Sequence, residues 1–361
     1  MKAALLTDGP GELVIADVEI SSPKGKEVLL RTVHAGLCHS DLHVMKGDLP
    51  YPMPVLMGHE SAGVVEEVGP DVTSCAPGDH VITYLALYCG RCRFCLDGRP
   101  TICENVRTLE RARDDEPRLS RDGTVVTPFA RLGSFAERML VHEHAVVKIR
   151  EDMPLDKAAL IGCGVSTGLG AAFNRPGVRP GDTVAVIGAG GVGLSVIQGA
   201  RIAGANRIIV VDVVQSKLDL ALQLGGTDAV NAGDGDPVAA VQELSKGGVD
   251  IAFEAIGLTA TAEQAFKMIG RGGTAVMVGV VPAGAEVSVS GLDVTLQEKT
   301  LMGSYMGSVN FPTDLPRFVD MYLDGRLRLD EMVSHHLSLE QVNEGFELMA
   351  EGKAARSVID F

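Results

Sequence analysis

Six of the seven cysteines fall into two groups whose spacing is typical of metal ligands. Cys89, Cys92 and Cys95 are separated by two residues each, and Cys103 follows after seven more. Four thiolates so close in sequence usually form a closed tetrahedral zinc site with a structural role, because no position remains for a substrate. An iron–sulfur cluster, which also takes four cysteines, is the alternative.

Three further residues could ligate a second metal ion. Cys38 lies in a turn-like segment, His59 follows a glycine, and Cys163 has a glycine on each side. A cysteine–histidine–cysteine set leaves one position of a tetrahedral zinc open, as in catalytic sites. Taken singly, a buried cysteine is usually a small apolar residue and a lone histidine a hydrogen-bonding one. The count favours the metal interpretation, because only Cys75 is left over, and for it we expect a structural role.

The segment 183–212 has the pattern of a dinucleotide-binding unit. An apolar run leads into Gly188, Gly190 and Gly193, which form G-x-G-x-x-G at the start of an expected helix. Such a turn brings a pyrophosphate against bare backbone and the helix N-terminus. The next expected strand ends at Asp212, about twenty residues on, where a carboxylate accepts hydrogen bonds from the adenosine ribose. The acid would repel a 2′-phosphate, so NAD is favoured over NADP.

The composition limits what kind of protein positions these groups. A chain of 361 residues is too long for one ordinary core, so we expect two domains. The net charge of −15 argues against a nucleic-acid partner. Glycine interrupts the longest apolar runs, and the amino terminus has too short an apolar run for a signal peptide, so we expect no membrane span and a cytoplasmic location. A reducing compartment also favours metal binding over disulfides.

The expected elements divide the chain into a β-rich part and a part with alternating strands and helices. Residues 1–100 have short strands with turn signals, typical of a barrel-like domain. Residues 104–128 are polar and predict a solvated surface excursion. From residue 183 to about 305, strands and helices alternate, which predicts a doubly wound parallel sheet. We expect strands near 184–188, 207–212, 249–254, 274–280 and 299–304, and helices near 192–204, 215–224, 236–245 and 260–269.

Several motifs together resemble one family. They are GLCHSDLH, GHESAGVVEEVG, the four-cysteine cluster, LIGCGVSTGLGA, VIGAGGVG and the terminal ARSVIDF. The chain resembles a zinc-dependent alcohol dehydrogenase of the medium-chain dehydrogenase/reductase superfamily over essentially its whole length. The resemblance implies an α/β fold in which a β-rich GroES-like catalytic domain (1–164 and 306–361) surrounds a Rossmann NAD-binding domain (165–305), with the active site in the cleft between them.

The resemblance also implies roles for residues near the two zinc ions. Cys38, His59 and Cys163 are expected to hold the catalytic zinc, and the four-cysteine cluster the structural zinc. Four neighbours are expected to act in catalysis: Ser40 and His43 in a proton relay, Asp41 in orienting His59, and Glu60 near the metal.

Cofactor and substrate contacts follow from the same resemblance. Expected cofactor contacts are His39, Thr167, Gly188, Gly190, Val192, Gly193, Asp212, Lys217, Val280 and Arg356. His39 replaces the arginine of many relatives, and a histidine is mostly neutral at pH 7, so a phosphate contact and a minor role are nearly equal alternatives. The expected substrate pocket is apolar, which favours alkyl or aromatic primary alcohols, and consists of Leu49, Leu85, Phe129, Val280 and Tyr305.

The resemblance leaves alternatives for the reaction and for the assembly. A thiol-adduct formaldehyde dehydrogenase shares every motif and would need cationic residues at the pocket mouth, which the segment 107–121 could supply. A non-catalytic zinc- or dinucleotide-binding protein would be expected to lack ligands that are all present here. We expect a homodimer through the last strand of the coenzyme domain, about 300–307, with a tetramer as the alternative.

Overall fold

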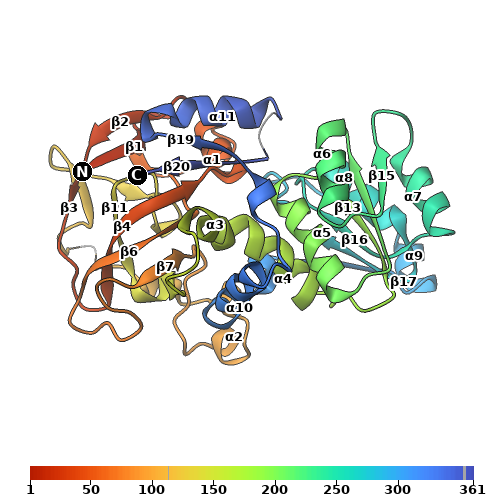
Figure 1. The fold of residues 1–361 in the computed structure, drawn as a ribbon, viewed down its shortest axis with the longest axis horizontal. Helices are drawn as coiled ribbons and strands as arrows, with labels where there is room; N and C mark the ends of the chain where they lie inside the picture. Colours follow the sequence, from red (N-terminus) through yellow and green to blue (C-terminus); the bar gives the residue numbers. More distant parts are fainter. Residues whose placement is uncertain (113, 353–354) are drawn as a thin grey trace. The chain divides into compact units, whose positions relative to one another are not determined.

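The computed structural model describes residues 1–112, 114–352 and 355–361, which form two compact units (Figure 1). The first unit contains Met1–Cys163 and Asn310–Phe361, and the second contains Gly164–Val309. The sequence placed these boundaries after residues 164 and 305. The site ligands expected for metal lie in the first unit, and the glycine-rich turn lies in the second.

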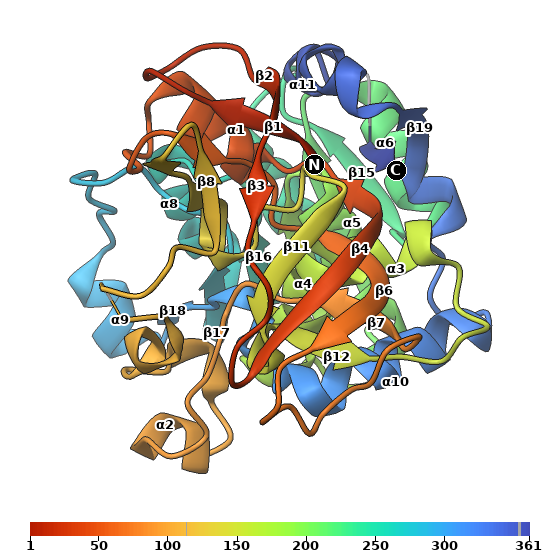
Figure 2. The ribbon, with the colours of Figure 1, turned by 90° about the vertical axis from the view of Figure 1, so that its left-hand side faces the viewer.

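The first unit is β-rich, as predicted, and its main sheet has the strand order β12-β7-β6-β4-β20-β19, with β11 also paired to β4. Figure 2 shows β11, β4 and β6 side by side, and their pairing is antiparallel. The strands are β4 (Glu27–Gly36), β6 (Ser61–Val68), β7 (His80–Thr83), β11 (Arg138–His142), β12 (Val146–Lys148), β19 (Val333–Leu337) and β20 (Arg356–Asp360).

Two smaller sheets complete the strands of this unit among the described residues. One has the order β10-β5-β1-β2 and the other β3-β8-β9. The strands are β1 (Lys2–Leu6), β2 (Val14–Asp17), β3 (Glu19–Ile20), β5 (Val55–Leu56), β8 (Leu119–Arg121), β9 (Thr124–Val125) and β10 (Thr127–Pro128). The helices are α1 (His39–Lys46), α2 (Arg93–Leu96), α3 (Leu155–Leu160), α10 (Phe311–Leu323) and α11 (Val342–Ala350).

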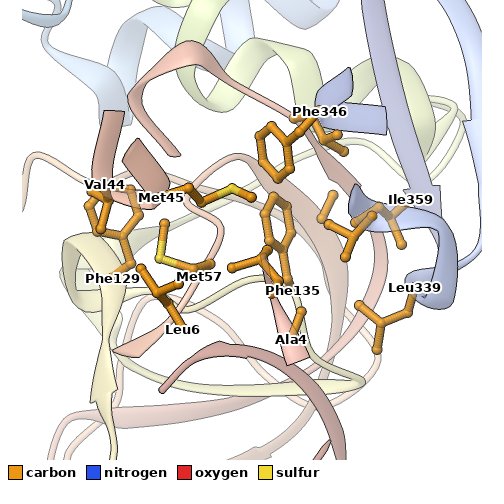
Figure 3. Close-up of a cluster of buried hydrophobic side chains, with 14 of the residues drawn as sticks. Ala4, Leu6, Val44, Met45, Met57, Phe129, Phe135, Leu339, Phe346 and Ile359 are labelled. Carbon is orange, nitrogen blue, oxygen red and sulfur yellow. The ribbon is translucent and has the colours of Figure 1, made fainter. Parts of the chain in front are cut away.

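One apolar cluster fixes α1 against the rest of the first unit (Figure 3). Val44 and Met45 on α1 pack with Met57, and the rings of Phe135 and Phe346 meet edge to face at 6.1 Å in the same cluster. Burial of side chains of this size contributes roughly 1.5–3 kcal/mol each. The core therefore holds α1, on which the expected catalytic residues Ser40, Asp41 and His43 lie, in one position.

The polar segment 104–128 differs from the predicted solvated excursion. It contains a 3₁₀ turn (Val106–Leu109) and the strands β8 and β9, and two of its arginines are largely buried. Arg111 and Arg118 both bind the carboxylate of Glu27, which is itself only 4% exposed. A buried partner at the start of β4 explains why these charges do not face water. Arg113, in the same predicted segment, lies outside the described residues.

The second unit contains the predicted doubly wound parallel sheet, with the strand order β15-β14-β13-β16-β17-β18. Its strands are β13 (Thr183–Ile187), β14 (Arg207–Asp212), β15 (Asp228–Asn231), β16 (Val249–Glu254), β17 (Ile269–Met277) and β18 (Thr300–Gly303). Its helices are α4 (Ser166–Asn174), α5 (Gly191–Ala203), α6 (Gln215–Gln223), α7 (Pro237–Ser245), α8 (Thr259–Met268) and α9 (Gly291–Leu296).

Helices α4 and α9 of this unit were not predicted, and two of its strands also differ from the prediction. The edge strand β15 was not predicted, because its four residues carry little apolar pattern. Strand β17 begins at Ile269 and ends at Met277, whereas the prediction ran from 274 to 280. The glycines at its start weakened the expected strand pattern. Within the described residues, no helix is both long and apolar enough to cross a membrane.

Candidate active site and metal centres

Strand pairing and a helical irregularity bring Cys38, His59 and Cys163 together in the first unit. Cys38 lies just beyond the end of β4, and His59 lies just before β6, with which β4 pairs antiparallel. The pairing of the two strands reaches Ala35 and Ser61. Cys38 and His59, which are twenty-one positions apart in sequence, therefore meet at one end of the sheet. Cys163 lies in a π-helical turn (Ile161–Val165), an irregularity that is frequent at functional sites.

The geometry of these three residues fits a tetrahedral metal ion. Their ligand atoms all lie within 4.8 Å of one another, and all three residues are buried. The Sγ of Cys163 is 3.4 Å from the Nε2 of His59. Zinc bound to sulfur and nitrogen at its usual bond lengths separates these atoms by about 3.5 Å. The residues therefore fit a zinc ion held by three protein ligands, which leaves one position for a substrate.

Asp41 orients His59 from the side away from Cys163. The Nδ1 of His59 is 3.2 Å from a carboxylate oxygen of Asp41, and the backbone N–H of Gly58 donates to the same carboxylate at 3.1 Å. Burial alone would lower the pKa of His59, but the charges of Asp41 and Cys38 raise it well above its usual value. The Nε2 atom is thus left to face the two thiols, as a metal ligand requires.

The two thiols of this site are strongly coupled. A hydrogen bond from Cys163 holds the pKa of Cys38 well below its usual value, despite burial. The same bond and burial raise the pKa of Cys163. The protein alone thus stabilises one thiolate, and a divalent cation is the group that would stabilise both.

Glu60 and Arg356 form a buried ion pair beside these ligands. The guanidinium of Arg356 donates to the Oε1 of Glu60, and both side chains are almost wholly buried. Burial raises the pKa of Glu60, against the opposing charge of Arg356. Arg356 was predicted as a pyrophosphate contact; in this structure its described partner is Glu60, and its other donors are compatible with a second acceptor.

The residues of the expected proton relay follow Cys38 on α1. The Oγ of Ser40 lies 3.8 Å from the Sγ of Cys38. His43 lies one turn further along; its Nδ1 is 3.0 Å from the Oδ2 of Asp48, and its side chain is 49% exposed. His39 is exposed. Along α1, Ser40 thus lies near the buried ligand Cys38, and His43 lies nearer the solvent.

The four cysteines of the second cluster also surround a point that fits one metal ion. The Sγ of Cys92 lies 3.4 Å from that of Cys95 and 3.9 Å from that of Cys103, and Cys89 and Cys95 are 4.0 Å apart. Tetrahedral zinc separates sulfur ligands by about 3.8 Å. An iron–sulfur cluster would bind these sulfurs to different irons and hold them further apart. All seven cysteines are free of disulfides.

The pKa values of the thiols in this four-cysteine cluster are also shifted in opposite directions. Backbone N–H groups, that of Cys95 first, lower the pKa of Cys92 to about 6. Burial raises the pKa of Cys95 to about 12. Closely packed thiols resist simultaneous ionisation unless a cation compensates the charge.

The glycine-rich turn of the second unit joins β13 to α5. Gly188 has φ +97°, and any side chain on Gly193 would overlap the carbonyl oxygen of Gly188. Gly190 precedes the first turn of α5, where Val192 lies. The backbone N–H groups of this turn can therefore approach an anion closely.

Asp212 ends β14 and holds this turn in place. Its Oδ2 accepts from the backbone N–H of Ala189 at 2.8 Å, and its Oδ1 accepts from Val214 at 3.0 Å. Each carboxylate oxygen has a further lone pair for a ribose hydroxyl. Lys217 lies on the following helix, α6, and Thr167 is buried on α4 with its hydroxyl 3.7 Å from the sulfur of Met306.

The predicted pocket residues are divided between the two units. In the first unit, the ring of Phe129 meets the imidazole of His59 edge to face at 5.4 Å, Leu85 is half-buried, and Leu49 is exposed. In the second unit, Val280 and Tyr305 are exposed. Phe129 is thus the predicted pocket residue that the described structure brings next to a candidate ligand.

Sequence reasoning missed two residues near these sites. Tyr51 packs edge to face on Phe129 at 5.1 Å, and its hydroxyl accepts from the N–H of Ala130. Glu254, buried at the end of β16, accepts backbone N–H groups from the loop that follows, including that of Gly257 at 2.7 Å. For Glu254, the sequence signal that could have found it is an acidic residue at the end of an apolar strand, followed closely by a glycine.

Comparison with known proteins identifies two family domains in the chain. Residues 24–151 match the alcohol dehydrogenase GroES-like domain, and residues 191–324 match the zinc-binding dehydrogenase domain. The chain belongs to the zinc-dependent medium-chain dehydrogenases/reductases. Membership makes it an oxidoreductase that uses zinc and a nicotinamide dinucleotide.

Similar family members act on more than one kind of substrate. An NDMA-dependent alcohol dehydrogenase from Amycolatopsis methanolica is 42% identical, over 99% of this chain and 98% of that protein. An S-(hydroxymethyl)glutathione dehydrogenase from Photobacterium damsela subsp. piscicida is 40% identical, over 99% of both. The crystal structure of benzyl alcohol dehydrogenase from Acinetobacter calcoaceticus is 33% identical, with a TM-score of 0.94, and covers 100% of this chain and 99% of that one.

Proposed function

We propose that this protein is an NAD-dependent alcohol dehydrogenase that reversibly oxidises primary alkyl or aromatic alcohols to aldehydes. One observation carries the proposal: the buried set Cys38, His59 and Cys163 has the spacing of three zinc ligands and has the apolar ring of Phe129 against His59. The apolar neighbour favours an alkyl or aromatic group next to the reacting oxygen.

The proposed reaction would need a zinc ion and NAD in addition to the side chains of the protein. Cys38, His59 and Cys163 would hold a zinc ion, which would supply Lewis-acid polarisation and lower the pKa of an alcohol. The glycine turn of the second unit would hold NAD, which would supply the hydride acceptor. Asp41 keeps the His59 imidazole in one orientation, and Phe129 and Tyr51 exclude water beside it.

The proton of the alcohol needs a path to water. The Oγ of Ser40, near Cys38, is placed to accept it, and the imidazole of His43, half-exposed beside Asp48, is placed to release it to solvent. A hydroxyl both accepts and donates a proton, so Ser40 works in either direction of the reaction. His43 carries out the exchange with bulk water, where other bases can replace it.

The choice of NAD rests on Asp212. Its carboxylate lies at the end of β14 and accepts from the N–H of Val214, just before α6. This negative charge would repel a 2′-phosphate. A second zinc ion at the four-cysteine cluster is proposed from the sulfur separations of 3.4–4.0 Å.

A homodimer is the proposed assembly, with a tetramer as the alternative. Strand β18 lies at the edge of the six-stranded sheet, and an unpaired edge is a template for a second copy. Light scattering should give twice the chain mass of 37.9 kDa. A mass equal to one chain would exclude both assemblies.

Thiol-adduct formaldehyde dehydrogenase is the alternative activity, and one similar protein is named an S-(hydroxymethyl)glutathione dehydrogenase. It needs cationic residues that bind the acidic thiol carrier. Among the arginines considered for this role, Arg111 and Arg118 bind Glu27 instead, and Arg121 lies 3.7 Å from Asp122. Arg107 is exposed. Because Arg111, Arg118 and Arg121 already lie next to carboxylates of this chain, a simple alcohol is favoured over a thiol adduct as the substrate. The complete set of metal ligands favours an enzyme over a non-catalytic binding protein.

Substrate profiling tests the proposal. The holoenzyme with NAD should form NADH with benzylic and alkyl primary alcohols, and with a higher kcat/KM than with S-hydroxymethyl thiols. A clear preference for the thiol adducts would establish the alternative. NADH formation with none of these alcohols would contradict the proposed function.

A further inference from the structure

A third cluster of ligand-type side chains lies on the main sheet of the first unit, apart from the two cysteine-containing sites. Strands β4, β20 and β19 are neighbours in this sheet (Figure 1). Asp360 on β20 pairs directly with His34 on β4, and His336 on β19 pairs with Val358, two residues before Asp360. Because side chains alternate along a strand, the two histidines and the aspartate share one face.

The nitrogens of both histidines converge on one carboxylate oxygen. The Nδ1 of His34 and the Nδ1 of His336 each lie 2.9 Å from the Oδ1 of Asp360. One ligand atom from each of the three residues lies within 4.8 Å of the other two. Tetrahedral zinc separates nitrogen and oxygen ligands by about 3.3 Å, so small side-chain rotations would make room for an ion.

The local charge favours a cation at this place. The Oδ2 of Asp156, on α3, is 3.7 Å from the Nε2 of His336. Lys157 is the cation nearby, but its Nζ binds Asp156 at 2.6 Å and lies 3.7 Å from Asp330. Two carboxylates, those of Asp156 and Asp330, thus face this one ammonium group, and Asp360 adds a third negative charge beside the histidines. The side chains of His336 and Asp360 are 44% and 47% exposed, so an ion in solution can reach them.

We propose that His34, His336 and Asp360 form a third divalent-metal site, open to solvent, that takes Zn²⁺ or a similar imidazole-binding ion. Two imidazoles and one carboxylate favour zinc, cobalt or nickel over magnesium or calcium, which prefer oxygen ligands. The remaining coordination positions face water. The site is independent of the proposed alcohol oxidation, because it shares no residue with the catalytic set.

Metal binding there joins a strand from the amino-terminal part of the chain to two strands from its carboxyl-terminal part. It links the carboxyl-terminal strand β20 to β4 and β19, so an ion that binds the folded state stabilises the first unit by mass action. Millimolar chelator should reverse this effect under conditions in which the buried zinc ions remain bound.

Cobalt is the probe that separates this site from the others. The holoenzyme, with its zinc retained and loosely bound metal removed, is titrated with Co²⁺ and followed by calorimetry and absorption. The site should bind one further equivalent with cobalt d–d bands and without thiolate-to-cobalt charge transfer, because it contains no cysteine. His336→Gln and His34→Gln should each weaken this binding by at least about tenfold, since even outer-shell changes cost this much.

His335 provides the matched control. It is adjacent to His336 on β19 and contacts Ser334, so His335→Gln should leave cobalt binding unchanged. Added Zn²⁺ should raise the Tm of the wild type and of His335→Gln but not that of His336→Gln. The proposal is overturned if no further equivalent binds, if the new absorption includes thiolate charge transfer, or if the His336 and His335 variants bind alike. None of these outcomes depends on whether the enzyme oxidises alcohols.

Discussion

At the scale of single residues, the surroundings of His59 show how buried charges prepare a metal site. Asp41 accepts from the Nδ1 side, Cys163 faces the Nε2 side, and Phe129 packs against the ring. The N–H of the buried Gly58 donates to the Oδ1 of the buried Asp41 and helps to hold its carboxylate in place before any ion binds. The three ligands were predicted from residue type and count, but the contact between Phe129 and His59 required the fold.

The proposed proton path predicts unequal effects of two substitutions on α1. His43→Gln should slow alcohol oxidation by about tenfold, because water and buffer can replace an exposed base. Ser40→Ala should cost far more, since it removes the hydroxyl that lies 3.8 Å from the Sγ of Cys38, on the buried side of the path. Steady-state rates with increasing imidazole concentration test this, and imidazole should restore part of the rate to His43→Gln only. An unchanged rate in His43→Gln would remove this residue from the path.

Asp212 should affect both the choice and the affinity of the cofactor. Asp212→Ser removes the charge that repels a 2′-phosphate, so the ratio of kcat/KM for NAD to that for NADP should fall by at least about tenfold. Because the carboxylate also accepts from the N–H of Ala189, the KM for NAD should rise as well. Asp219→Ser, an exposed position on α6, is the control. An unaltered ratio in Asp212→Ser would contradict the assignment.

At the scale of elements, antiparallel pairing and one irregular helix explain why distant residues meet. The ends of β4 and β6 bring Cys38 to His59, and the π-helical turn after α3 brings Cys163 to both. Helices α5 to α8 and most strands of the second unit followed from the predicted alternation of strands and helices. The π-helical turn and β15 did not, because one extra residue in a helix and a four-residue edge strand leave no clear periodic signal.

The corner between β11 and β12 predicts a pH dependence of stability. Lys26 donates to Glu143 at 2.7 Å, and the N–H groups of Thr73 and Ser74 donate to its other oxygen. Burial opposes ionisation, but these donors lower the pKa of Glu143 to about 2. A lowered pKa contributes stability that is present above the ordinary value of 4.5 and is lost as the pH falls toward 2.

Glu143→Gln should therefore lower the unfolding free energy at pH 7 by about 2 kcal/mol and have a smaller effect near pH 3. Urea denaturation at both pH values measures the difference. Glu151→Gln, an exposed carboxylate in the same unit, should have little effect at either pH. An equal loss for Glu143→Gln at pH 7 and pH 3 would refute the electrostatic explanation.

At the scale of the whole molecule, the order of the strands decides which unit contains each candidate site residue. The first unit is assembled from both ends of the chain, because β20 inserts between β4 and β19. Sequence patterns predicted the two-part organisation and the parallel sheet, while the return of the carboxyl terminus followed only from resemblance. The ion pairs of Glu27 could not be predicted, because no local pattern links it to arginines more than eighty residues away.

The central claim is that Cys38, His59 and Cys163 form the catalytic zinc centre of an alcohol dehydrogenase. Its most direct test is NADH formation from benzyl alcohol by holoenzyme and two cysteine variants, with folding monitored by circular dichroism. Cys163→Ser should remain folded but lose turnover by at least about a thousandfold, because the metal supplies most of the charge stabilisation. Cys75→Ser, at a half-buried cysteine outside both clusters, should keep wild-type activity. A folded Cys163→Ser enzyme with turnover close to wild type would contradict the account.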